Sequence, residues 1–211
     1  MLTAEFFHLE EHAGVRVLRL QSSDGTNRLT RVCVLALTEV VRELAGTPRP
    51  WIITGNRRFF SAGADLGEIA ALSGPGAYEF SEMGQGLMKA IECFPAPVYA
   101  AISGYCMGGG LDLALACRRR IASWDAIFGH RGAALGLITG WGGTQRLPRL
   151  VGKAKALEIF VAAEKVHAKD ALRYGLVDAV VEDPVAEAVR QILTHGGIEP
   201  QFARRGSAVI R

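Results

Sequence analysis

The sequence lacks the features that mark several classes of protein. No apolar run reaches the roughly 18 residues of a membrane-spanning helix, and the opening residues carry no basic segment before an apolar one, so neither a membrane anchor nor a signal peptide is expected. The four cysteines (Cys33, Cys93, Cys106 and Cys117) form no C-x-x-C pair. This spacing favours reduced thiols, and we expect a cytoplasmic protein.

Several catalytic and binding motifs are missing as well. The chain has no Walker A sequence, no G-x-S-x-G, and no G-x-G-x-x-G between a strand and a helix. Nucleotide hydrolysis, serine esterase chemistry and dinucleotide binding therefore have no support. A net charge of +3 is too small to indicate nucleic-acid binding.

One metal-like motif fails for a structural reason. The run from His8 to His12 matches H-x-x-E-H, which needs a helix to bring both histidines to one face. An alternating strand pattern begins directly afterwards at Val15, so we expect two surface histidines on a hairpin and no metal site.

Glycine is unusually frequent in a chain of this length. The 211 residues suit one domain, yet 25 of them are glycine, about 12% against a usual 7%. Glycine costs backbone entropy, so an excess indicates places where the backbone itself must approach another group. We expect a domain over residues 1–195 and a tail, 196–211, that lacks periodicity and frays.

Hydrophobic periodicity predicts alternating strands and helices. Strands are expected at 15–20, 51–54, 98–102 and 176–181, and helices at 31–45, 76–93, 111–116, 153–161, 169–174 and 184–193. This alternation predicts an α/β chain. The basic run Arg118–Arg120 either complements the dipole of a helix C-terminus or contacts a phosphate.

Two glycine-containing turns share one design. Each follows a buried strand and opens a helix: Phe59–Leu66 after the strand at 51–54, and Ser103–Asp112 after the strand at 98–102. Free N–H groups at such turns point outward, and the helix dipole adds partial positive charge. Side by side, two such turns can form an oxyanion hole. Close helix–strand packing, which also requires glycine, is the alternative.

Four segments carry a resemblance to a known family. They are Ala62–Leu66 (AGADL), Gly104–Gly110 (GYCMGGG), Gly142–Leu147 (GGTQRL) and Gly175–Val177, with weaker echoes at Asn27-x-Leu29 and Val151–Lys153. On these motifs the chain resembles the crotonase superfamily, the enoyl-CoA hydratases and isomerases. The resemblance implies an α/β spiral of ββα units with a short helical C-terminal region. It also implies an acyl-CoA substrate, with coenzyme A as part of the substrate and no separate cofactor, and homotrimers or hexamers.

The resemblance also assigns roles by position. Backbone N–H groups of Ala62 and Gly109 would polarise the thioester carbonyl, whose oxygen becomes negative in an enolate. The coenzyme A groove would be lined by Asn27, Arg28, Ala64, Asp65 and Leu66.

The chain departs from the family at its catalytic acids. Hydratases of the family use two glutamates, whose positions are held here by Asp112 and Gly132. Because syn-addition of water needs an acid and a base on one water, we expect hydration to be slow. Asp112 would then shuttle a proton, as in an isomerase, or position a water for another reaction, or it is merely a first-turn acid facing the helix dipole. The altered chemistry expected is that of an isomerase, a decarboxylase or a thioester hydrolase.

Neighbouring residues offer further candidates. His130 is a candidate acid/base and Arg131 a candidate grip for a carboxylate or phosphate, unless both belong to the surface or an interface. Glu68 and Glu82 are weaker candidates. The family's usual chain has further helices over the acyl pocket, and we expect a neighbouring subunit to replace them or the cover to be absent. A crotonase-type enzyme with altered chemistry, a weak hydratase and a non-catalytic acyl-CoA-binding protein all remain open.

Overall fold

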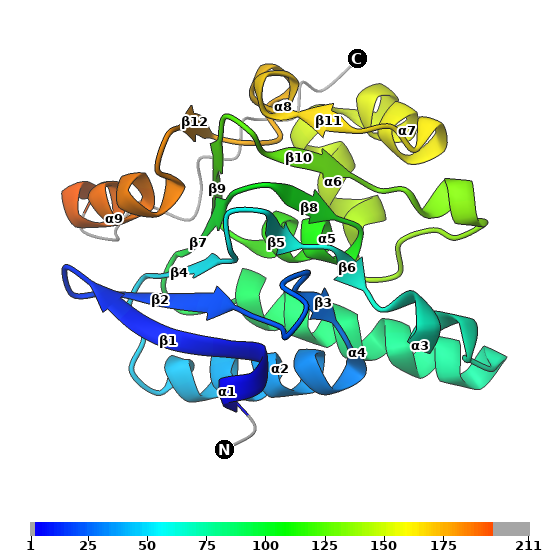
Figure 1. Ribbon diagram of the computed structural model, residues 1–211, viewed down its shortest axis with the longest axis horizontal. Coiled ribbons are helices and arrows are strands. Elements are labelled where there is room, and N and C mark those ends of the chain that lie inside the picture. The colour runs from blue at the N-terminus through cyan, green and yellow to red at the C-terminus, as the bar shows by residue number, and fades with distance from the viewer. Residues whose placement is uncertain (1–2, 196–211) are drawn as a thin grey trace, which may run out of the picture.

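The computed structural model describes residues 3–195, which form two main sheets with helices around them (Figure 1). The larger sheet has the strand order β1 (Phe7–His12), β2 (Val15–Leu20), β4 (Trp51–Thr54), β7 (Val98–Ile102), β9 (Arg119–Ser123) and β12 (Ala179–Val181). Its neighbours are parallel except for the antiparallel β1–β2 pair. The smaller sheet has the order β11 (Val166–His167), β10 (Ile127–Gly129), β8 (Tyr105–Met107) and β5 (Phe59–Ser61). Short strands β3 (Arg28–Leu29) and β6 (Gly63–Ala64) pair in parallel.

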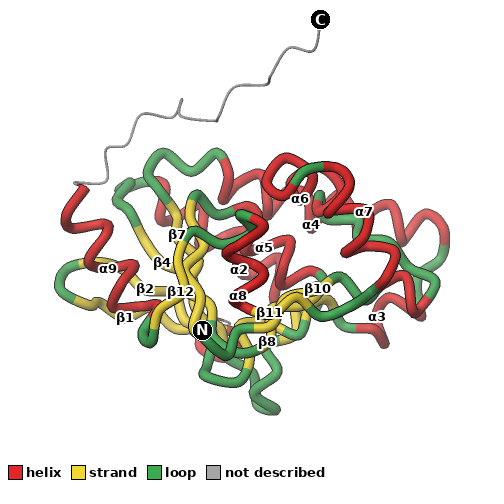
Figure 2. The backbone as a smooth tube through the Cα atoms, turned by 90° about the horizontal axis from the view of Figure 1, so that it is seen from above, coloured by secondary structure: helices red, strands yellow, loops and turns green. Residues whose placement is uncertain are grey.

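Helices lie around both sheets (Figure 1). They are α1 (Thr3–Phe6), α2 (Arg31–Ala45), α3 (Leu66–Ala70), α4 (Gly74–Glu92), α5 (Gly109–Ala116), α6 (Gly143–Val151), α7 (Lys153–Ala162), α8 (Ala168–Tyr174), α9 (Pro184–His195) and the 3₁₀ helix η1 (Gly132–Leu135). Figure 2 shows α9 on one side of the strands and α2 and α5 on the other. A small core of Val17, Ile52, Tyr99, Ile192 and their neighbours lies under α9. The main core fills the opposite side.

The chain winds as a spiral of repeated units. β4, β7 and β9 are adjacent parallel strands of the larger sheet, and the strands that follow them, β5, β8 and β10, are adjacent parallel strands of the smaller sheet. Helical segments follow each strand pair. This is the expected ββα spiral, and its parallel winding brings the ends of successive small-sheet strands together.

Most expected elements are present, with shifted ends. α2 follows its predicted cap, because the Thr30 hydroxyl accepts a hydrogen bond from the Cys33 N–H. α5 begins at Gly109, two residues before the predicted start. The last strand begins only at Ala179, because the Leu176 N–H is used to close α8 by donating to Ala171 O. Tail residues 196–211 lie outside the described residues. Within 3–195, every helix is too short or too polar to cross a bilayer.

Several segments were missed or read wrongly from the sequence, among them the four short strands of the smaller sheet. Helix α6 was not predicted, because it opens on glycine and contains Pro148. Arg119 and Arg120 belong to strand β9 and not to a helix end. Arg120 is nonetheless buried and donates to the carbonyls of Ala114 and Cys117 at the end of α5, so it does complement that helix and is not open to a phosphate.

Trp141 fixes the loop before α6 against two helices. Its indole Nε1 donates to Phe80 O at 3.1 Å, and its ring packs on the Phe80 ring. A Cβ added at Gly84 of α4 would lie 2.1 Å from that Nε1, and one added at Gly109 would lie 2.5 Å from the ring. Both helices therefore need glycine where the indole meets them.

Two glycines of α4 should respond oppositely to replacement by alanine. We expect Gly84→Ala to lower the free energy of unfolding by about 1–3 kcal/mol, because the buried indole has no room to retreat. Gly86→Ala, two residues along, should raise it by about 0.5–1 kcal/mol, since its Cβ meets nothing within 4 Å. Urea denaturation measures both. Equal changes in the free energy of unfolding would contradict this role of the Trp141 indole.

Candidate active site

The two glycine turns lie side by side, as predicted. β5 and β8 pair in parallel, and the segments that follow are in direct contact. A Cβ added at Gly63 would lie 2.7 Å from Met107 O and 3.2 Å from the Gly109 nitrogen. The contact is possible because Gly63 and Gly109 carry no side chains at the point where the two segments meet.

The Gly109 amide is available as a donor. Gly109 is the first residue of α5, so its N–H has no acceptor within the helix. The preceding Gly108 has φ +51° and ψ −121°, a conformation that side chains disfavour. This turn aims the start of α5 at the junction of the two segments.

The expected partner donor at Ala62 is wrong. Its N–H donates to Thr26 O at 2.9 Å and is already used within the fold. The Ala64 nitrogen instead lies 3.3 Å from the point where a Cβ on Gly109 would stand. Ala64 is thus the residue of the AGADL segment whose amide borders Gly109.

The expected coenzyme A residues divide into two groups. Asn27 is buried, and its side-chain amide donates to Phe59 O and Phe60 O, so it staples the fold and does not line a groove. Arg28 and Leu66 are exposed, and Arg28 forms ion pairs with Asp24 and Asp65. The Asp65 carboxylate accepts a hydrogen bond from the Glu68 N–H. This bond, with a smaller contribution from Arg28, lowers the pKa of the Asp65 carboxyl.

Asp112 is enclosed one helical turn after Gly109. Its side chain is 1% exposed, and its backbone N–H donates to Gly108 O. The hydroxyl of Thr139, from the loop before α6, donates to Oδ2 of the carboxylate. Thr139 was not singled out from the sequence, because an isolated threonine in a loop gives no signal.

His130 faces the same carboxylate from the end of β10. Its Nε2 lies 3.2 Å from Oδ1 of Asp112, and its side chain is 5% exposed. The two atoms are close enough to form an ion pair, but both are buried without a well-directed hydrogen bond. The Phe160 ring of α7 packs on the imidazole.

Gly143 completes the enclosure. A Cβ at this first residue of α6 would lie 2.2 Å from Oδ1 of Asp112 and 3.0 Å from Nε2 of His130. The motif Gly142–Leu147 was recognised from sequence, but its contact with the acid and the imidazole was not.

Backbone closely approaches Gly132, the position at which the resemblance expects a second glutamate. The Leu137 N–H donates to Gly132 O at 2.8 Å and folds the η1 loop back on itself. A Cβ at Gly132 would then lie 2.8 Å from Leu137 O. A glutamate at this position therefore requires the loop to move.

The remaining candidates lie outside this enclosure. Glu68 accepts from the Arg31 N–H at 2.7 Å and fastens α3 to the start of α2. Glu82 is exposed on α4, where it accepts from Tyr78. Arg131 is exposed next to His130. His8 and His12 lie on strand β1 beside Glu10, so the H-x-x-E-H match lacks its helix.

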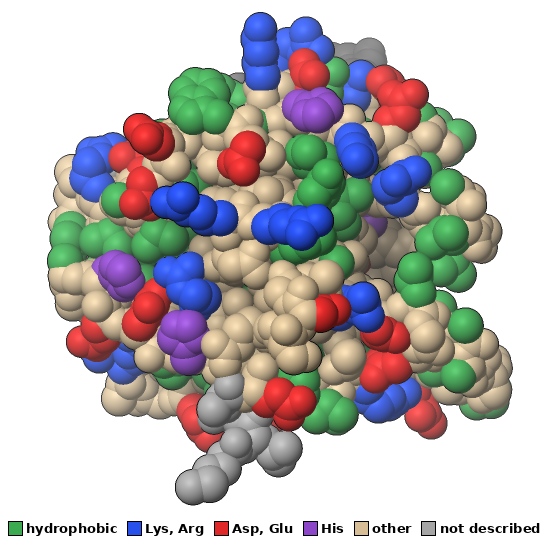
Figure 3. Space-filling model, viewed as in Figure 1, with side chains coloured by type: hydrophobic (Ala, Val, Ile, Leu, Met, Phe, Trp, Pro, Cys, Tyr) green, Lys and Arg blue, Asp and Glu red, His purple; other side chains and the backbone are tan. Residues whose placement is uncertain are grey.

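The surface opens on the side where η1 and α3 lie. Figure 3 shows the molecule hollowed near its right-hand edge, in the region between these two elements in Figure 1. Leu66 of α3 and Leu135, Leu137 and Ile138 of the η1 loop are exposed large apolar side chains. Exposed apolar side chains thus lie on both of the elements that border this hollow.

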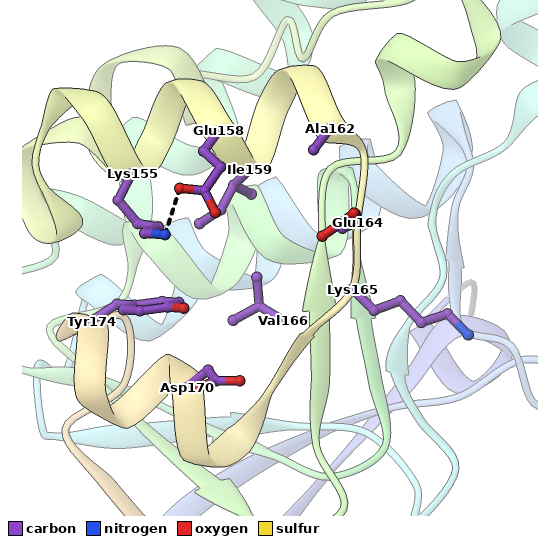
Figure 4. Close-up of a pocket in the computed structure, with 9 residues that line it drawn as sticks. All are labelled: Lys155, Glu158, Ile159, Ala162, Glu164, Lys165, Val166, Asp170 and Tyr174. Carbon is purple, nitrogen blue, oxygen red and sulfur yellow. Dashed lines mark hydrogen bonds and ion pairs between the residues drawn. The ribbon is translucent and has the colours of Figure 1, made fainter.

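A second hollow is unrelated to this chemistry. It is a pocket of about 130 Å³ between α7 and α8, lined by residues that include Lys155, Glu158 and Tyr174 (Figure 4). Lys155 pairs with Glu158 and lies over the Tyr174 ring. These charges satisfy one another.

Comparison with known proteins agrees with the geometry. Residues 10–197 match the family described as "Enoyl-CoA hydratase/isomerase". A probable enoyl-CoA hydratase of Bacillus subtilis is 51% identical over 136 residues, which are 64% of this chain and 53% of that protein. A crotonyl-CoA hydratase of Syntrophomonas wolfei is 38% identical, over 82% of this chain and 68% of that protein. The solved enoyl-CoA hydratase of Bacillus anthracis has a TM-score of 0.86 at 32% identity, covering 93% of this chain and 78% of that one.

Proposed function

Because the chain belongs to the enoyl-CoA hydratase/isomerase family, we propose that it acts on acyl-CoA thioesters by moving a proton at the carbon next to the thioester carbonyl. The observation that carries this proposal is the Asp112 carboxylate, buried one turn after the Gly109 amide. Enolate formation requires a base and an oxyanion donor that lie close together.

In the proposed reaction the Gly109 amide, with that of Ala64 beside it, holds the thioester oxygen. Asp112 removes the proton from C2, the electron pair of the C–H bond forms the enolate, and the oxygen gains negative charge. Return of the proton to C2, or its delivery to a further carbon, ends the cycle. The bond from Thr139 holds the carboxylate in one orientation.

Two groups of reactions place negative charge on a thioester oxygen held in this way. Isomerase, decarboxylase or hydrolase chemistry was preferred from the loss of the second glutamate, but the names of the relatives give that preference no support. Hydration is the second candidate, and it is favoured by the hydratase names of the two curated relatives. A slow hydration rate, relative to enzymes with two glutamates, stays a prediction.

Deuterium exchange tests the common step without knowledge of the acyl group. In D₂O, the protein should exchange the C2 hydrogens of butyryl-CoA, which proton NMR or mass spectrometry follows. Exchange needs a base and an enolate but no water addition, so it reports the proposed function alone. Tight binding of butyryl-CoA without exchange would favour the non-catalytic acyl-CoA-binding protein.

Other expectations from the family also stay predictions. These are a coenzyme A groove at Arg28, Ala64, Asp65 and Leu66, assembly into trimers or hexamers, a cytoplasmic location and the need for no separate cofactor.

A further inference from the structure

The site holds two buried polar atoms that lie close together and have no well-directed hydrogen bond. They are Oδ1 of Asp112 and Nε2 of His130, 3.2 Å apart. Buried polar groups in proteins are nearly always satisfied, so an unsatisfied pair needs an explanation. A catalytic role that supplies the missing partner from water or substrate is one.

Backbone packing leaves no room for a side chain at Gly132, the position at which the resemblance expects the second glutamate. A side chain at Gly132 meets Leu137 O, whereas His130, two residues earlier, reaches the carboxylate directly. The same loop therefore removes one titratable group and presents another.

We infer that the imidazole of His130 is the second proton-transfer group of the site and makes hydration of 2-enoyl thioesters possible without a second glutamate. This inference rests on the proposed function. It goes beyond it by naming the group that handles the second proton and by specifying the substrate class.

The proton balance closes through the contact between the two groups. His130 takes a proton from water as the water oxygen bonds to C3, and the alkene electrons move to the enolate held at Gly109. The carboxyl of Asp112 then gives its proton to C2. The proton left on His130 passes to Asp112 and restores both groups, so one water has been added and nothing else has changed.

Groups from three helices enclose the imidazole of His130. His130 faces Asp112 on α5, Gly143 at the start of α6 and the Phe160 ring on α7. Cys106 on β8 is also close to Asp112, but burial, with smaller contributions from Cys117 and Asp112, raises the pKa of its thiol well above the ordinary value. That thiol stays protonated and takes no part.

The test compares hydration of crotonyl-CoA with deuterium exchange into butyryl-CoA in the full chain. His130→Gln keeps a polar atom near Nε2 but does not titrate. We expect kcat for hydration to fall by about 10²–10⁴, with KM changed by less than about threefold. Exchange at C2 should stay within about tenfold of the wild type, because it needs Asp112 alone.

The pH profile and a second variant separate chemistry from packing. The wild-type kcat profile should show a pH limb that His130→Gln removes, because glutamine cannot exchange a proton. His130→Phe, which keeps a ring against Phe160, should show the same loss if the glutamine variant folds poorly. His167→Gln, at an exposed histidine on β11, should leave all rates and the pH limb unchanged.

The possible failures are distinguishable. A wild type that neither exchanges nor hydrates overturns the proposed function. If the wild type exchanges but hydrates nothing, or if His130→Gln and His130→Phe keep the hydration rate and the pH limb, the role of His130 is overturned while the proposed function stands.

Discussion

Replacing Asp112 by asparagine is expected to slow C2 exchange of butyryl-CoA by about 10²–10⁴, the range for loss of a general base. Asparagine keeps the size of the side chain and an oxygen that can accept from Thr139, so the enclosure stays filled. It cannot take a proton. The affinity for butyryl-CoA should change by less than about threefold, because the effect lies on the reaction step and not on binding.

A matched control separates catalysis from helix electrostatics. Asp170 lies in the first turn of α8, as Asp112 does in α5, and it pairs with Arg173 on the surface. Asp170→Asn should leave exchange unchanged and cost only a few tenths of a kcal/mol in stability, about the value of a surface pair. If Asp112→Asn loses fold and affinity together, Asp112 is structural. An unchanged exchange rate in a folded variant would remove it from the mechanism.

The fold could be predicted well because its signals are local. The runs at 51–54 and 98–102 are apolar except for Thr54 and lie buried in the larger sheet, as is typical of parallel strands. Thr30 and the glycines that open α5 mark helix starts. Prediction failed where a local hydrogen bond competed with the predicted element, as at Leu176, whose N–H donates to Ala171 O and closes α8 instead of extending a strand.

The site was harder to predict because it is made of backbone. A motif reveals that Ala62, Ala64 and Gly109 lie near a turn, but not which amide is already bonded. Only the register of the loop shows that Ala62 N–H is taken by Thr26 O. Likewise, the resemblance shows that glycine stands at position 132 where a glutamate is expected. The contact of His130 with Asp112, however, depends on how the chain after β10 folds.

Removing the Gly109 amide should produce the other large loss. Gly109→Pro deletes the N–H, and proline is compatible with the first residue of a helix. Loss of one oxyanion donor costs about 10²–10³ in rate. We therefore expect C2 exchange of butyryl-CoA to fall by this factor relative to a variant that keeps the amide.

Gly109→Ala is that variant, and the comparison with it is essential. Alanine, like proline, places a Cβ 2.5 Å from the Trp141 ring and disturbs the packing of the indole against α5. Both variants should therefore have a lower free energy of unfolding than the wild type. The ratio of their exchange rates then isolates the N–H from the packing. If proline and alanine give equal rates in folded protein, the Gly109 amide does not hold the thioester oxygen, and the donor must be sought at Ala64 or elsewhere along the junction.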